Sequence, residues 1–312
     1  FTGEPFGKKY RAALDGLIEN HSSVAQTAAA QGFASCSALN RALLGYCGLD
    51  ASNLKALVGC AQFVLTLPPR YRVAETLAYL ARDPRSHNVK RRSPDSVTLA
   101  LVMRDVAFSA TVTFGERSVA VELDTILDNT TAGPCVSIFR RLLGFAAPTD
   151  ALLRRARTEP EVQRLIRHRR GLTVHQTATA WDALVWAVVG QQISLIAAYA
   201  LLRALSQAAG LPVGSALRTL PRADAVAHMS ASELRACKLS KAKTKTLHLL
   251  ANRILAGELD FDALEHGSAV TAYEVLISQH GVGPWTANYV MMRGFGFADC
   301  APIGDAGLRR AL

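Results

Sequence analysis

The sequence lacks the features that mark several common classes of protein. Its 312 residues include six cysteines, but no two of them form a Cys-x-x-Cys pair, so neither a zinc knuckle nor a disulfide scaffold is indicated. No apolar run approaches the ~18 residues that a membrane span needs, and the first residues do not resemble a signal peptide. We therefore expect a cytoplasmic protein with reduced thiols and no contact with a membrane.

Acidic residues are the scarcer charged type, with 25 Asp and Glu against 35 Lys and Arg, which gives a formal net charge of +10. The excess lies mainly in residues 61–180, which carry 18 basic and 11 acidic side chains. A charge of this size favours a polyanionic partner. Hydrophobic residues make up 50% of the chain, so sizeable cores can form, and the length favours two or three domains.

The first 60 residues show helical spacing. A helix is predicted over residues 7–20, and two shorter helices follow, separated at Gly32, the second running over residues 35–46. Two helices joined by a glycine turn are typical of a helix-turn-helix, although an ordinary helical hairpin would show the same pattern. Residues 20–57 resemble the second helix-turn-helix of AraC-type regulators, through the rhythm Ala-x-x-x-Gly-Phe-x-Ser-x-Ser-x-Leu-x-Arg. The resemblance implies that four residues face DNA: Ser35, Ser37, Ala38 and Arg41.

The residue pattern changes in the middle of the chain. A Pro-Pro stop at residues 68–69 precedes a short predicted helix over residues 73–81. Residues 96–124 alternate in polarity and are rich in β-branched side chains, with a turn at Gly115-Glu116-Arg117, which predicts an antiparallel sheet. Helices dominate from residue 132 onwards. We therefore predict an α+β chain with an all-α helix-turn-helix over residues 1–60, a β-rich lobe over 61–140 and a helical domain over 141–312.

Two features are interpreted as structural. Cys135 follows a proline, as alkyl-accepting cysteines do, but no basic residue follows it to lower the thiol pKa, so we expect a small buried side chain. The arginines between residues 154 and 170 are interpreted as a solvated helical face.

The stretch over residues 280–305 carries the strongest functional pattern. Gly281-Val282-Gly283 predicts a tight turn, and Pro284 suits the first position of a helix, so backbone N–H groups would be presented at a helix N-terminus. Trp285 and Tyr289 lie four residues apart and share a face of that helix. Asp305 follows as a lone carboxylate that begins a further helix.

This stretch, together with Val-Gly-Gln-Gln-Ile-Ser at residues 189–194, resembles the helix-hairpin-helix DNA glycosylases, most closely the bacterial 3-methyladenine DNA glycosylase II group. The likeness extends from about residue 63 to residue 312. It implies a mostly helical glycosylase with an N-terminal antiparallel β lobe. Its expected substrate is double-stranded DNA containing alkylated bases, and its expected reaction is hydrolysis of the N-glycosidic bond of an alkylated purine after base flipping.

The resemblance assigns roles to individual residues. The hairpin of Gly281, Val282 and Gly283 would bind a DNA phosphate, Trp285 and Tyr289 would wall the base pocket, and Asp305 would be catalytic. An ordinary turn, two core aromatic residues and a helix N-cap are the alternative interpretations of the same residues. Lyase-capable relatives carry a lysine where this chain has Trp285, and the last lysine here is Lys245, so hydrolysis without strand cleavage is expected.

Further contacts are expected around this centre. Gln192 would act as the DNA wedge, and Lys241 and Lys243 would contact phosphates. The resemblance also allows a Na⁺ or K⁺ ion on the backbone of Ile277, Gln279 and Val282, with no cofactor required. We expect a monomer associated with the nucleoid, and a pocket left incomplete where the sequence stops 7 residues after Asp305. The alternative function is a transcription regulator of the alkylation response whose glycosylase-like lobe only binds DNA.

Overall fold

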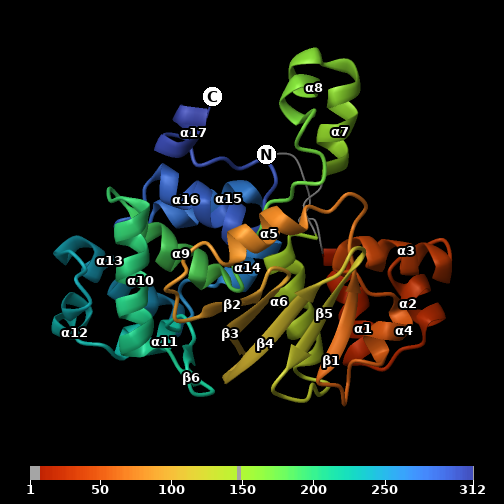
Figure 1. Ribbon diagram of the computed structural model, residues 1–312, viewed down its shortest axis with the longest axis horizontal. Helices are drawn as coiled ribbons and strands as arrows, with labels where there is room; N and C mark the ends of the chain where they lie inside the picture. Colours follow the sequence, from red (N-terminus) through yellow and green to blue (C-terminus); the bar gives the residue numbers. More distant parts are fainter. Residues whose placement is uncertain (1–7, 146–148, 312) are drawn as a thin grey trace.

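The computed structural model describes residues 8–145 and 149–311, and its helices lie on both sides of one antiparallel sheet (Figure 1). The N-terminal elements are α1 (Lys8–Ile18), α2 (Val24–Ala30), α3 (Cys36–Cys47), α4 (Ala51–Lys55), β1 (Gln62–Thr66), α5 (Val73–Leu80), β2 (Val89–Ser93), β3 (Ser96–Met103), β4 (Val106–Phe114), β5 (Ser118–Leu123) and α6 (Ala132–Leu143).

The remaining elements are almost entirely helical. They are α7 (Thr149–Thr158), α8 (Pro160–Ile166), α9 (Ala180–Gly190), α10 (Leu195–Ala209), β6 (Pro212–Val213), β7 (Leu217–Arg218), α11 (Ala223–His228), α12 (Ala231–Ala236), α13 (Lys241–Leu255), α14 (Phe261–His266), α15 (Ala269–Ile277), α16 (Pro284–Val290), the π-helical turn η1 (Met291–Phe295) and α17 (Ala306–Ala311).

The sheet has the strand order β1-β5-β4-β3-β2, and all of its neighbouring strands are antiparallel. The predicted hairpin is confirmed, since β4 and β5 flank the turn at residues 115–117 and pair in register from Phe114 with Val119. In β4, buried and less buried residues alternate from Ala107 to Phe114, as the sequence pattern predicts for a sheet with one face on the core. The predicted α+β character is confirmed.

The N-terminal helices share a core with this sheet. Leu17 of α1, Leu39 of α3, Val112 of β4 and Phe139 of α6 belong to one buried hydrophobic cluster. The helices predicted before residue 60 are present, although Gly7, the first residue of the predicted 7–20 helix, lies outside the described residues. Because α1 to α4 pack into the core of the β lobe, removal of these helices would expose its apolar interior.

A second buried cluster joins the helices of the C-terminal half. It contains residues of α9, α10, α13, α15, α16 and η1, among them Leu184, Leu247 and Met291. The helical stretch predicted to carry the arginines between residues 154 and 170 is divided into α7 and α8 at Pro160, a residue that suits a helix start and cannot continue the preceding helix. The arginines of these two helices are exposed, and Cys135 is buried with a pKa raised to about 12 by burial, both as expected.

Ion pairs connect the two halves. Arg203 of α10 lies 2.6 Å from Asp83, and the buried Arg141 of α6 lies 2.7 Å from Glu265 of α14. These pairs fix the helical half against the β lobe because each one joins side chains that are largely withdrawn from water. Within residues 8–145 and 149–311, no helix is long and apolar enough to cross a membrane.

Candidate active site

The hairpin at residues 278–283 connects α15 to α16 and has the predicted form. Gly281 adopts a φ of +77°, and a Cβ placed there would lie 2.0 Å from Oγ1 of Thr246 on α13. Only glycine therefore satisfies both the backbone conformation and the close approach of α13. The N–H of Val282 donates to the carbonyl of Gln279 over 3.1 Å, and Gly283 is the N-cap residue before Pro284.

Trp285, Tyr289 and Asp305 are brought together, as the sequence motif predicts. The rings of Trp285 and Tyr289 stack with centroids 5.4 Å apart and planes inclined by 28°. The indole Nε1 of Trp285 donates to Oδ2 of Asp305 over 3.0 Å. The aromatic pair on α16 and the carboxylate before α17 therefore form one constellation, although 20 residues separate Trp285 from Asp305.

Asp305 also caps the last described helix. Its Oδ1 accepts the backbone N–H groups of Gly307, over 2.8 Å, and of Leu308, over 2.9 Å. Burial acts to raise the pKa of Asp305, but the hydrogen bonds from Leu308, Trp285 and Gly307 outweigh it, so the pKa lies below its ordinary value. The carboxylate is therefore ionised at neutral pH and held in a fixed direction.

The other end of the aromatic pair faces positive charge and further rings. Burial is the main cause that raises the pKa of Tyr289, and a smaller effect comes from Tyr79 of α5. The guanidinium groups of Arg82 and Arg293 lie over the Tyr79 ring, 4.2 Å and 4.9 Å from its centroid. The β lobe thus contributes to the surroundings of Tyr289, a contribution that spacing along the sequence cannot show.

Gln192 occupies the tip of the turn between α9 and α10. Its side chain is exposed and its φ is +57°, an uncommon conformation for a residue with a Cβ. The neighbouring Gln191 points the other way: its Nε2 donates to the carbonyl of Gly281 and to Oγ1 of Thr286, each over 3.0 Å. Sequence reasoning missed Gln191, because two adjacent glutamines do not show which one turns inward.

The two lysines predicted to contact phosphate have different surroundings. Lys241 is exposed at the first position of α13. Lys243 is buried, and its Nζ donates to the carbonyl of Val189 at the end of α9 over 2.7 Å. This corrects the expectation for Lys243, whose ammonium group holds the end of a helix inside the protein instead of pointing into solvent.

The remaining predicted residues lie as follows. Ile277 ends α15, Gln279 and Val282 lie in the hairpin, and the carbonyl of Gln279 already accepts the N–H of Val282. Among the residues that the structure describes, no group of three or more His, Cys, Asp or Glu side chains could hold a metal ion. This observation does not test backbone carbonyls, so the monovalent cation stays a prediction.

The predicted DNA-facing residues of the N-terminal helices lie on or next to α3, at the right of Figure 1, whereas α16 and α17 lie at its upper left. Oγ of Ser35 accepts the N–H of Ala38 over 3.1 Å and caps α3, while Ser37 and Arg41 are exposed along that helix. Their role in DNA binding stays a prediction.

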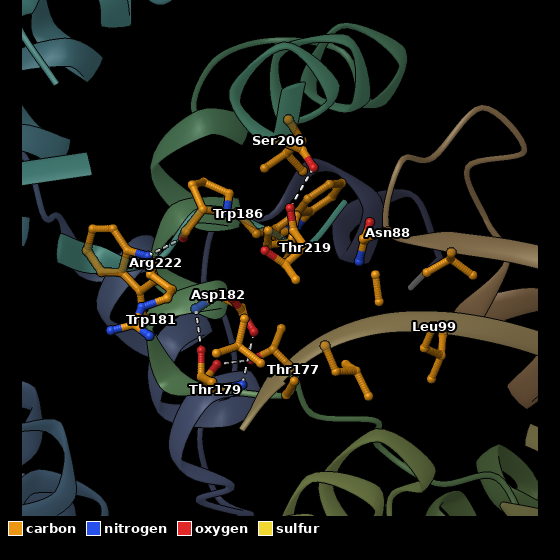
Figure 2. Close-up of a pocket in the computed structure, with 18 of the residues that line it drawn as sticks. Asn88, Leu99, Thr177, Thr179, Trp181, Asp182, Trp186, Ser206, Thr219 and Arg222 are labelled. Carbon is orange, nitrogen blue, oxygen red and sulfur yellow. Dashed lines mark hydrogen bonds between the residues drawn. The ribbon is translucent and has the colours of Figure 1, made fainter. Parts of the chain in front are cut away.

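A cavity of about 570 Å³ lies between the β lobe and helices α9 and α10 (Figure 2). Its walls include Leu99 of β3, Trp181, Asp182 and Trp186 of α9 and Ser206 of α10, and they do not include Trp285 or Asp305. Burial raises the pKa of Asp182, which accepts the N–H of Thr179 over 3.0 Å as part of the N-terminal cap of α9. Asp182 is therefore occupied with capping α9, and the constellation around Asp305 is the better candidate for chemistry.

Part of the chain matches a known family. Residues 185–312 match the family described as HhH-GPD superfamily base excision DNA repair protein. The matched part includes the turn of Gln192, the hairpin, Trp285, Tyr289 and Asp305.

About half of the chain matches individual curated relatives. The chain is 33% identical over 160 residues to a DNA-3-methyladenine glycosylase of Bacillus subtilis, covering 50% of this chain and 53% of that protein. It is 31% identical over 176 residues to a probable bifunctional transcriptional activator/DNA repair enzyme AlkA of Mycobacterium tuberculosis, covering 55% of this chain and 34% of that protein. The matched regions thus span about half and about a third of these relatives.

The fold also resembles that of a solved protein. The structure of a 3-methyladenine DNA-glycosylase from Archaeoglobus fulgidus superposes with a TM-score of 0.69 at 22% identity, covering 80% of this chain and 84% of that one. This similarity includes the β lobe as well as the helical half, since it extends well beyond the 185–312 region.

Proposed function

We propose that the chain is a DNA glycosylase that removes alkylated purines of the 3-methyladenine type from double-stranded DNA, in base excision repair. The observation that carries the proposal is the hydrogen bond of 3.0 Å between Trp285 Nε1 and Asp305 Oδ2, beside the stacked ring of Tyr289. It places an ionised carboxylate at the edge of an aromatic pair, within a region that matches a base excision family. The B. subtilis relative, named as a DNA-3-methyladenine glycosylase, supports this substrate class.

The chemistry follows from charge. An N-alkylated purine carries a positive charge, and the electron-rich faces of Trp285 and Tyr289 attract such a ring once it has left the base stack. The bond between C1′ and the purine nitrogen breaks with its electron pair leaving on the base, and positive charge develops on the sugar. The fixed carboxylate of Asp305 stabilises that charge, and water then adds to C1′ and releases a proton to solvent.

DNA would be bound mainly through its backbone. The hairpin at Gly281, Val282 and Gly283 leads into the N-terminus of α16, where a phosphate can accept backbone N–H groups without any reading of sequence. Exposed Lys241 adds a charge at the start of α13, and exposed Gln192 would fill the space left by the extruded base. A Na⁺ or K⁺ ion on the carbonyls of Ile277, Gln279 and Val282 is part of this proposal, because oxygen dipoles replace the hydration shell of such ions.

We further propose hydrolysis without cleavage of the strand. A lyase needs an amine that forms a Schiff base with C1′, and position 285 holds an indole whose N–H is directed to Asp305. Borohydride should therefore trap no covalent complex between the protein and damaged duplex DNA. A trapped complex that survives denaturing electrophoresis would refute this part of the proposal.

The central test measures the released base. Duplexes containing methylated purines, hypoxanthine or ethenoadenine are incubated with the protein, and the products are identified by mass. Asp305→Asn keeps the shape and leaves the capping oxygen Oδ1, but it removes the charge, so base release should fall by at least a hundredfold. No release by the wild-type protein from any duplex, or equal release by Asp305→Asn, would contradict the enzyme proposal.

A regulatory role for the N-terminal helices is a second candidate. It is favoured by the exposed Ser37 and Arg41 on α3 and by the name of the M. tuberculosis relative, which includes a transcriptional activator. In this proposal α2 and α3 form an AraC-type helix-turn-helix. Because these helices share the core of the β lobe, the test is Arg41→Ala in the intact chain: loss of a sequence-specific footprint with unchanged base release supports the proposal, and the absence of any specific footprint by the wild type refutes it.

A further inference from the structure

The turn between α9 and α10 has a backbone conformation that does not suit its residues. Gln191 has φ −54° and ψ 126°, and Gln192 has φ +57°, which are the angles of a type II turn whose third position favours glycine. A side chain in the left-handed region is disfavoured because its Cβ lies too close to the following carbonyl oxygen. Such a conformation persists only where neighbouring contacts hold it, and this one presents an exposed glutamine at its tip.

The contacts that hold the turn come from both sides of it. On one side, Nζ of Lys243 donates to the carbonyl of Val189 over 2.7 Å and fixes the end of α9 to α13. On the other side, the Nε2 group of Gln191 donates to two acceptors, the carbonyl of Gly281 and Oγ1 of Thr286, each at 3.0 Å. A single amide group thus joins the turn to the hairpin and to α16.

Both acceptors of Gln191 belong to parts of the candidate site. Gly281 is the hairpin residue held against Thr246, and Thr286 is 2% exposed and follows Trp285 directly in α16. The hydrogen bonds of Gln191 therefore join the turn that carries Gln192 directly to the helix that carries the aromatic pair. An amide suits this place because it offers two N–H donors, whereas a carboxylate offers none and a leucine offers no polar group.

We propose that Gln191 is a positioning residue for base extrusion: its two hydrogen bonds hold the wedge turn against the hairpin and α16, so that insertion of Gln192 delivers the base to Trp285 and Tyr289. The inference rests on the proposed glycosylase function. It assigns Gln191 no contact with the base, and it predicts that the rate of excision depends on Gln191 while the affinity for undamaged duplex DNA does not.

The test uses Gln191→Leu, which keeps the approximate volume and removes both donors, in the full chain. The single-turnover rate of base release should fall about tenfold, because two neutral hydrogen bonds are lost. The dissociation constant for undamaged duplex should change less than twofold. In an Asp305→Asn background, which isolates extrusion from chemistry, the fluorescence rise of a 2-aminopurine placed at the flipping position should be reduced in Gln191→Leu.

Thr286 provides a matched pair of controls. Thr286→Val keeps the buried shape and removes one acceptor, so release should slow about threefold, whereas Thr286→Ser keeps the hydroxyl and should stay within twofold of the wild type. The double variant Gln191→Leu/Thr286→Val should be no slower than Gln191→Leu alone, because both changes remove the same bond.

The outcomes separate the two proposals. If the wild-type protein releases no base, the glycosylase function fails. If it releases base and Gln191→Leu is equally fast, or if the effects of Gln191→Leu and Thr286→Val are multiplicative, the positioning role is refuted. A lower fraction of active protein with an unchanged rate constant in the remainder would show that Gln191 only supports folding, and would also overturn the inference.

Discussion

Gly281 is the residue of the hairpin whose replacement should have the largest cost. In Gly281→Ala, the new Cβ would lie 2.0 Å from Oγ1 of the buried Thr246. The backbone of the alanine would also have to keep a φ of +77°. The left-handed conformation costs roughly 1–2 kcal/mol, and overpacking of a buried contact typically costs about 1–3 kcal/mol. We therefore expect a loss of about 2–5 kcal/mol in the free energy of unfolding.

Gly283 offers a control two residues away in the same turn. Its φ is −95°, and an added Cβ would meet no atom within 4 Å. Gly283→Ala should therefore change the stability by less than about 1 kcal/mol, since the backbone conformation is open to alanine and only a small cap effect opposes it. Urea unfolding followed by circular dichroism measures both variants under the same conditions.

The two contributions at Gly281 can be separated through Thr246. Thr246→Ala removes Oγ1 and Cγ2 and leaves a Cβ at 3.0 Å, so Gly281→Ala/Thr246→Ala should recover most of the packing cost and retain the backbone cost. The double variant should be more stable than the two single changes predict by about 1–3 kcal/mol. If Gly281→Ala is as stable as Gly283→Ala, the conclusion that α13 approaches the hairpin too closely to admit a side chain at position 281 is refuted.

Two further predictions concern charge. Lys241→Ala should weaken binding to duplex DNA and lower the slope of log affinity against log salt concentration by about 1. Lys243→Met should leave that slope unchanged and lower the stability of the fold, because the Lys243 Nζ donates to the Val189 carbonyl inside the protein. Equal slopes for both variants would contradict this distinction. The pKa of His175 is lowered to about 4, mainly by burial and then by the charge of Arg293, whereas a histidine in the unfolded chain titrates near ~6.5. Between these two pH values the unfolded chain binds a proton that the folded chain does not. The free energy of unfolding should therefore fall by about 3 kcal/mol as the pH drops from roughly 6.5 to 4. Urea unfolding of the wild type and of His175→Gln over this pH range measures the contribution of His175 to the loss of stability. If the stability of both proteins falls equally with pH, the prediction is refuted.

The parts of the candidate site that depend on a local sequence pattern could be predicted from the sequence. A spacing of four places Trp285 and Tyr289 on one helix face, and glycine, valine, glycine and proline in succession predict a turn before a helix, as observed. The sheet hairpin at residues 115–117 was predictable for the same reason, since alternation and a turn occur within a few residues. The family resemblance supplied the role of Asp305, but the bond from Trp285 spans a loop whose course no periodicity determines.

The incorrect expectation for Lys243 has a simple geometric origin. Lys241 and Lys243 lie close together in the sequence, but two residues along an α-helix correspond to a rotation of about 200°, so their side chains point in nearly opposite directions. Lys241 consequently meets solvent, and Lys243 meets the end of α9. Gln191 and Gln192 diverge in the same manner across a turn. Charge and polarity counted along a sequence therefore overstate the number of groups available to DNA whenever the positions lie on opposite faces.

The hydrogen bonds of Asp305 also limit what this carboxylate can do. Its Oδ1 accepts two backbone N–H groups, and its Oδ2 accepts the Trp285 indole N–H. In the proposed reaction, the charge available to the sugar would therefore lie on the remaining lone pair of Oδ2, beside the aromatic pair. The same donors lower the pKa of Asp305, which makes it a poor proton donor at neutral pH. In the proposed reaction, a site with this geometry would stabilise positive charge and would not protonate a leaving group. The proposed substrates, cationic alkylated purines, need no such proton because they already leave readily.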